Sequence, residues 1–127
     1  MINENGDPRI IDFGLSKDTK NQTIQLKSMV GSKIFMAPEI IDGSGHSCPS
    51  DMWSLGIILY MMLSGSYPFS NRAIEKEICE APVLYLPPNK WVNVSSEAKH
   101  LISQLLDKCP TTRLTARDAL DHPWFKK

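Results

Sequence analysis

The sequence has no excess of charge of either sign, no paired cysteines and no long hydrophobic run. Lys and Arg total 14, as do Asp and Glu, so charge favours neither nucleic acid nor an anionic membrane as a partner. Three widely spaced cysteines without C-x-x-C are typical of reduced thiols, not of a disulfide framework or a zinc site. The longest apolar run, 52–63, is shorter than the ~20 residues that span a bilayer, and the N-terminus MINENGDP is too polar for a signal peptide. These absences predict a soluble cytoplasmic protein.

Turn-forming residues precede a short β-branched run near the N-terminus. Asn-Gly-Asp-Pro at 5–8 leads into Arg-Ile-Ile at 9–11, with Met1-Ile2 as a stub of a partner strand. We therefore expect residues 1–11 to form a β-hairpin that is cut short on its first side. Residues 15–33 are polar without a sustained period, which predicts a long loop.

The rest of the sequence is dominated by helical patterns. Ser50 is expected to cap a central helix over 51–63, which Ser64-Gly65 ends. This helix is apolar nearly all round, which predicts a buried element. Its expected core residues are Trp53, Leu55, Ile58, Leu59 and Met62.

Three further segments complete the helical part. A short polar helix is expected over 71–80, followed by an irregular proline-containing segment, 81–94. Ser95 then opens an amphipathic helix, and Thr115 with Asp118 has the spacing of a capping box at the start of a last short helix. The apolar stripe of the amphipathic helix consists of Ala98, Leu101, Ile102, Leu105 and Leu106.

Two triplets in a fixed order carry a family resemblance. Asp12-Phe13-Gly14, within GDPRIIDFGLSKD, is followed after a loop by Ala37-Pro38-Glu39. SDMWSLGIILYMMLSGSYPF (50–69) and SSEAKHLISQLLDKCPTTRLTARDALDHPWF (95–125) then follow at matching distances. Together they resemble the C-terminal lobe of eukaryotic protein kinases, and are most similar to the calcium-dependent and calcium/calmodulin-dependent serine/threonine kinase group.

The resemblance implies a mainly α-helical fold and an organisation of the whole chain. Residues 1–127 would be part of a kinase domain, from the strand before Asp12 to the last helix. Within it, 1–11 would be the β-hairpin remnant, 12–39 the activation segment and 40–127 the helical C-lobe.

For the first triplet, the resemblance implies a role in metal binding. Asp12 would hold the Mg²⁺ that bridges the phosphates of ATP, whereas the alternative is an ordinary surface turn aspartate. Phe13 would pack in an apolar spine, and Gly14 would let the backbone flip. Ser28 falls where relatives carry an activation-loop phosphoacceptor, and its alternative is a solvated loop serine.

The resemblance also implies roles in substrate binding and in holding the lobe together. Gly31, Ser32, Phe35 and Met36 match the segment that receives the substrate residue after the phosphorylated one. Serine at 32 keeps the hydroxyl that is linked to Ser/Thr specificity, and phenylalanine at 35 stands where relatives usually have tyrosine. Three further residues have structural roles in the family: Glu39 and Arg113 as a buried ion pair, and Asp51 as the central-helix carboxylate that hydrogen-bonds the catalytic loop.

Several kinase motifs do not occur in this sequence. It contains no G-x-G-x-x-G loop, V-A-I-K lysine, H-R-D-type loop or D-x-D-x-D-G calcium loop. We therefore expect the catalytic base, the lysine and the N-lobe to lie upstream of this chain, with any calcium-sensing region also outside it. Three interpretations remain: an enzyme part that transfers phosphate from ATP to protein Ser/Thr only when completed, a substrate-docking or scaffold module, and a fragment without function.

Overall fold

The computed structural model describes residues 1–16, 32–45, 47–69 and 73–126, and in these ranges helices predominate. This confirms the prediction of a mainly α-helical chain. None of the described helices is both long and apolar enough to cross a membrane. The α-helices are α1 (Pro38–Ile41), α2 (Cys48–Ser64), α3 (Ile74–Glu80), α4 (Ser96–Leu105) and α5 (Ala116–Leu120), with 3₁₀ turns at Phe13–Leu15, Lys33–Phe35, Pro88–Trp91 and Pro123–Phe125.

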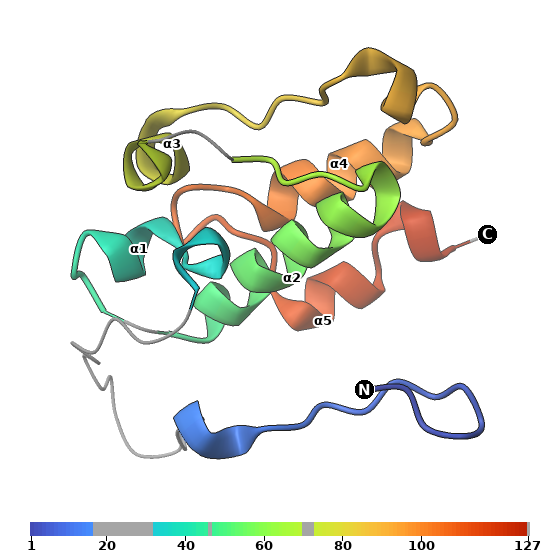
Figure 1. Ribbon diagram of the computed structural model, residues 1–127, viewed down its shortest axis with the longest axis horizontal. Coiled ribbons are helices and arrows are strands. Elements are labelled where there is room, and N and C mark those ends of the chain that lie inside the picture. The colour runs from blue at the N-terminus through green and yellow to red at the C-terminus, as the bar shows by residue number, and fades with distance from the viewer. Residues whose placement is uncertain (17–31, 46, 70–72, 127) are drawn as a thin grey trace.

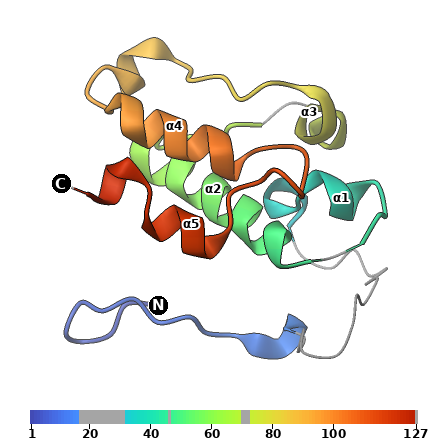
Figure 2. The same cartoon turned by 180° about the vertical axis from the view of Figure 1, so that it is seen from behind.

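Helix α2 lies at the centre of the helical body (Figure 1), with α4 packed along it. Helices α1 and α3 gather at one end, and residues 1–16 lie apart from the helices in both views (Figures 1 and 2). The N-terminal segment makes one antiparallel bridge, between Ile2 and Pro8, in which Met1 and Arg9 exchange backbone hydrogen bonds of 2.7 and 2.9 Å. A β-hairpin is therefore not confirmed, because no ladder extends from this bridge within the described residues.

Helix α2 begins earlier than the sequence suggested. Its N-cap is Ser47, and the Ser47 N–H donates to the Ser50 hydroxyl at 3.3 Å, so Ser50 lies in the first turn and is not the cap. Pro49 fits this first turn because a proline there lacks only an N–H that the helix does not use. The predicted end is confirmed: Gly65 adopts φ 65° and its N–H donates to the Met61 carbonyl.

The sequence predicted too much burial for α2. Trp53 is fully buried, but Leu55, Ile58 and Met62 are 47%, 44% and 78% exposed, so their assignment to the core was wrong. These three residues recur at i, i+3 and i+7, which places them on one side of the helix, here called the α2 outer face. An all-round apolar helix does not reveal which side its neighbours cover, and α4 covers the opposite side.

The capping predictions for α4 and α5 are confirmed. The Ser95 hydroxyl accepts the Ala98 N–H at 3.2 Å, and the Thr115 hydroxyl accepts the Asp118 N–H at the same distance. The predicted apolar stripe, which runs along α4 and ends at its C-cap residue, is buried throughout. Its members are Ala98, Leu101, Ile102, Leu105 and Leu106.

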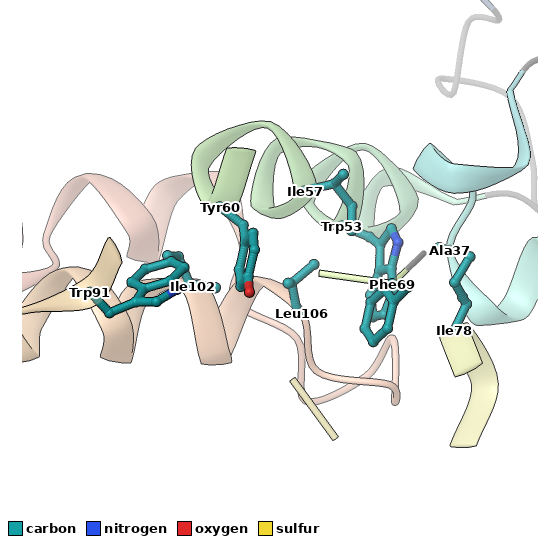
Figure 3. Packing of buried hydrophobic residues seen from close by; sticks show 9 residues of the cluster. All are labelled: Ala37, Trp53, Ile57, Tyr60, Phe69, Ile78, Trp91, Ile102 and Leu106. Carbon is teal, nitrogen blue, oxygen red and sulfur yellow. The ribbon is translucent and has the colours of Figure 1, made fainter. Parts of the chain in front are cut away.

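Aromatic side chains fill the core between α2 and the segments around it (Figure 3). Trp53 and Phe69 stack at a centroid distance of 5.9 Å. Tyr60 contacts Trp91 at 4.7 Å, and its hydroxyl donates to the Leu84 carbonyl at 2.6 Å. Apart from the 3₁₀ turn Pro88–Trp91, the segment 81–94 is therefore fixed by aromatic contacts and by the hydrogen bond from Tyr60.

Gly56 of α2 lies directly against the end of α4, so substitution there should destabilise the fold. A Cβ at this position would lie 2.8 Å from Leu106 Cδ2 and 2.9 Å from Leu105 Cβ. We predict that Gly56→Ala lowers the free energy of unfolding by about 1–3 kcal/mol, although alanine favours helix. Urea denaturation measures this, with Met62→Ala on the exposed side of α2 as the control. Equal losses in the two variants would contradict the prediction.

The α2 outer face predicts self-association of the isolated 127-residue chain. Contiguous apolar surface of a few hundred Å² favours contact between copies. We expect sedimentation velocity to show a mass that rises with concentration, and Ile58→Lys/Met62→Lys to shift the chain towards monomer. Val92→Lys is the control, because Val92 is 76% exposed but lies outside this face. A monodisperse wild-type monomer would refute the expectation.

Candidate functional site

Asp12 stands in an unusual backbone conformation at the start of the first 3₁₀ turn. Its φ of 64° and ψ of 74° are left-handed, a region that few residues other than glycine adopt. Its side-chain Oδ1 accepts the Gly14 N–H at 3.4 Å, and the residue is exposed. Such outliers gather at functional sites, so this conformation supports the choice of Asp12 as a candidate ligand.

Phe13 is 66% exposed. Its expected packing in an apolar spine is therefore not found among the described residues. Two other predicted positions, Ser28 and Gly31, lie outside the described residues, as does the rest of 17–31.

The segment that follows is built into the helical body. Phe35, Met36 and Ala37 pack towards the core, with Met36 and Ala37 buried. The Ser54 hydroxyl of α2 donates to the Phe35 carbonyl at 2.9 Å. Ser32, by contrast, is exposed at the start of the 3₁₀ turn, while the backbone behind it is fixed.

The structure brings Glu39 and Arg113 together in a buried, two-pronged ion pair. Arg113 Nη1 donates to Glu39 Oε1 at 2.7 Å and Nη2 to Oε2 at 2.8 Å. The Ser50 hydroxyl donates to the same Oε1 at 2.8 Å. Parallel bonds from a planar guanidinium to a carboxylate are among the strongest hydrogen bonds in proteins. Helix α1, which carries Glu39, is thus anchored to the loop after α4.

The remaining donors of Arg113 are also satisfied. Nη1 donates to the Pro49 carbonyl at 2.8 Å and Nε to the Asp107 carbonyl at 2.9 Å, while the guanidinium lies 5.3 Å from the Trp53 ring centroid. Burial raises the pKa of Glu39, but hydrogen bonds from Arg113 and Ser50 and the charge of Arg113 outweigh it, so the pKa lies below its ordinary value. The Glu39 carboxylate is therefore held in its ionised form and fixes α1 to Arg113.

Asp51 lies exposed in the first turn of α2. Its carboxylate forms no hydrogen bond or ion pair with another residue in the described part of the chain, so the role that the resemblance gave it stays a prediction. At this position its negative charge interacts favourably with the partial positive charge of the helix N-terminus.

Sequence reasoning missed an ion pair between the 3₁₀ turn Lys33–Phe35 and α3. Lys33 Nζ lies 2.5 Å from Glu75 Oε1, and both side chains are about half exposed. The two residues are 42 positions apart, so no local pattern could have indicated the contact.

Known proteins are similar to this chain over nearly its whole length. The model of the protein kinase domain matches residues 1–125. Calcium/calmodulin-dependent protein kinase cmkB of Emericella nidulans is 40% identical over 126 residues, which cover 96% of this chain and 31% of the relative. CDPK-related kinase 5 of Arabidopsis thaliana is 43% identical over 122 residues, covering 93% and 20%. Myosin light chain kinase A of Dictyostelium discoideum is 38% identical over 120 residues, covering 92% and 40%. The chain thus spans less than half the length of these relatives.

The buried ion pair predicts a large, pH-dependent loss of stability when Glu39 is neutralised. Glu39→Gln leaves Arg113 without its counter-charge, at an expected cost of about 3–5 kcal/mol. Because the pKa of Glu39 is lowered in the fold, its contribution is complete above the ordinary carboxyl pKa and is lost as the pH falls through the folded-state value. Wild-type stability should therefore fall below about pH 5 more steeply than that of Glu39→Gln.

Urea denaturation between pH 3 and 7 measures both effects. Glu80→Gln is the matched control, because Glu80 is exposed at the end of α3. An unfolding free energy of Glu39→Gln within about 0.5 kcal/mol of wild type would show that the pair contributes no stability.

Proposed function

The chain belongs to the protein kinase family, and from this we propose that it is the C-terminal part of a serine/threonine protein kinase catalytic domain. In the complete protein this domain would transfer the γ-phosphate of ATP to Ser or Thr of protein substrates. The observation that carries the proposal is the anchoring of residues 32–39 by the Glu39–Arg113 pair. Residues 32–36 of this stretch belong to the segment 31–36, here called the substrate segment, to which the resemblance assigns substrate binding.

Asp12 is the residue of this chain that would hold Mg²⁺ beside ATP. When bound, the ion would neutralise charge on the phosphates. Among the described residues no three metal-ligating side chains come together. One exposed carboxylate nevertheless fits a magnesium site, because Mg²⁺ usually takes one or two carboxylates and completes its shell with phosphate oxygens and water. The chain alone should therefore bind neither ATP nor Mg²⁺ well.

The segment 31–36 would receive the protein substrate. Ser32 is exposed and offers a hydroxyl, while behind it the Phe35 carbonyl is bonded by Ser54 of α2 and Met36 is buried. The hydroxyl at 32 supports Ser/Thr specificity through the family resemblance. We further propose that Ser28 is a regulatory phosphosite of the same segment.

Calcium regulation would come from outside this chain. Two of the similar proteins are named as calcium/calmodulin-dependent or CDPK-related kinases. By this likeness the complete protein would carry a calcium-sensing region. We also propose that it acts in the cytoplasm, since its three unpaired, widely spaced cysteines are typical of reduced thiols.

A substrate-docking or scaffold module is the second candidate function. Its support is that Ser54 holds the Phe35 carbonyl, and Arg113 and Ser50 hold Glu39 just after the substrate segment, with contacts from this chain alone. Positioning by several groups is needed for phosphoryl transfer, so docking could persist where transfer does not.

Asp12→Asn in the complete protein tests the proposed activity. We predict that transfer of phosphate from ATP to a Ser/Thr peptide falls more than about hundredfold, because a charge that balances the phosphates is removed. The melting temperature should stay unchanged, since Asp12 is exposed. Radiolabelled ATP gives the rate, and Asp7→Asn, an exposed aspartate of the same segment, is the control.

Each alternative gives a different result in this assay. Near wild-type turnover by Asp12→Asn would show that the metal ligand is misassigned. Absence of transfer by the wild-type complete protein, with retained peptide binding, would instead support the docking module. The isolated chain should show no transfer above a buffer control.

A further inference from the structure

Lys108, in the loop between α4 and α5, reaches across the helical body to α3. Its Nζ donates to the Ile78 carbonyl at 2.6 Å. The same ammonium lies 4.2 Å from the Phe69 ring centroid and 4.9 Å from that of Trp53. These two rings are stacked almost parallel, so Lys108 binds α3 and the aromatic core at once.

The backbone of Lys108 also contacts the buried ion pair. Its carbonyl accepts a long hydrogen bond, 3.4 Å, from Arg113 Nη2, which pairs with Glu39. Lys108 is thus joined through its backbone to the anchor of α1 and through its side chain to α3. Sequence reasoning gave this residue no role.

Helix α3 depends on such contacts for its placement. It runs for only seven residues, and helices this short do not persist by themselves. Inward, it inserts the fully buried Ile78 into the core cluster that includes Ala37. Outward, Glu75 holds Lys33 of the substrate segment. A shift of α3 would therefore move the partner of Lys33.

We propose that Lys108 is a positioning residue: it fixes α3, and through the Glu75–Lys33 pair it orients residues 32–36 for binding a peptide substrate. The substrate part rests on the proposed function. Lys108 is connected to residues 32–36 in three steps. Its side chain bonds the Ile78 carbonyl of α3, α3 carries Glu75, and Glu75 pairs with Lys33.

The charge of Lys108 is held at a cost, which separates positioning from stability. Burial lowers the pKa of its amine to about 8, with the Arg113 charge acting in the same direction and Cys79 of α3 opposing it. The Arg113 charge is itself paired with Glu39 of α1. Since this pKa lies below that of an unfolded lysine, the fold gains stability as the pH rises from about 8 to 10. Loss of the charge and loss of its contacts therefore act on stability in opposite directions, so peptide affinity and α3 exchange report the positioning role, and the melting temperature does not.

The test compares Lys108→Met, Lys108→Arg and Lys90→Met in the complete protein. The probe is an acceptor peptide selected by binding from a Ser/Thr library, with Ala in place of its phosphorylated residue. We expect Lys108→Met to weaken peptide binding about three- to tenfold, with ATP affinity within about twofold of wild type. Lys108→Arg, which keeps the charge and donors, should restore much of the affinity. Lys90→Met, at an exposed lysine, should change nothing.

Hydrogen exchange of the α3 amides provides a readout independent of activity. It should accelerate in Lys108→Met and stay unchanged in Lys90→Met. Glu75→Gln should weaken peptide binding as well, and Lys108→Met should add little to it if both act on one path. Unchanged peptide affinity in Lys108→Met, unchanged α3 exchange, or full additivity with Glu75→Gln would each overturn the proposal. Peptide binding that responds as expected, in a protein that transfers no phosphate, would support the proposal while the proposed function fails.

Discussion

The bidentate pair between Glu39 and Arg113 is the contact on which the arrangement of this chain depends. It joins α1 to the loop after α4. Ser50 bonds Glu39 and so connects the pair to the start of α2, while Lys108 accepts from Arg113 and connects the pair to α3. A charged pair removed from water is stable only when its remaining donors and acceptors are met. Here the carbonyls of Pro49 and Asp107 accept hydrogen bonds from the remaining donors of Arg113. The pair therefore holds three backbone segments together: α1, the start of α2 and the loop after α4.

Residues 32–36, part of the proposed substrate segment, are fixed to the helical body at one end and exposed at the other. Residues 35–37 are held by the core and by Ser54, whereas Ser32 and Lys33 stay exposed and Lys33 meets α3 through Glu75. A rigid backbone beneath exposed polar groups is a suitable basis for recognising a protein chain, because little freedom is lost when the partner binds. Under the proposed function, the helical body would support substrate binding by holding the backbone of residues 35–37 in place.

Sequence reasoning succeeded where the determining signals are local. The caps at Ser95 and Thr115, the end of α2 at Gly65 and the apolar stripe of α4 all follow from residues within a few positions of each other. It failed for the α2 outer face, since an all-round apolar pattern carries no direction, and for the start of α2, where Pro49 fits inside the helix. Lys33–Glu75 and Lys108–Ile78 left no signal, and Glu39 was matched to Arg113 by family resemblance alone.

The double contact of Ser50 has a consequence for the order in which the fold assembles. Its hydroxyl accepts from Ser47 and donates to Glu39, 11 residues away, whereas Arg113 is 74 residues from Glu39. The entropy of closing a loop grows with the logarithm of its length, so the longer closure costs roughly 1.7 kcal/mol more than the shorter one. We expect Ser50 to hold the Glu39 carboxylate first, so that Arg113, arriving late from the far end of the chain, meets an acceptor already turned inward.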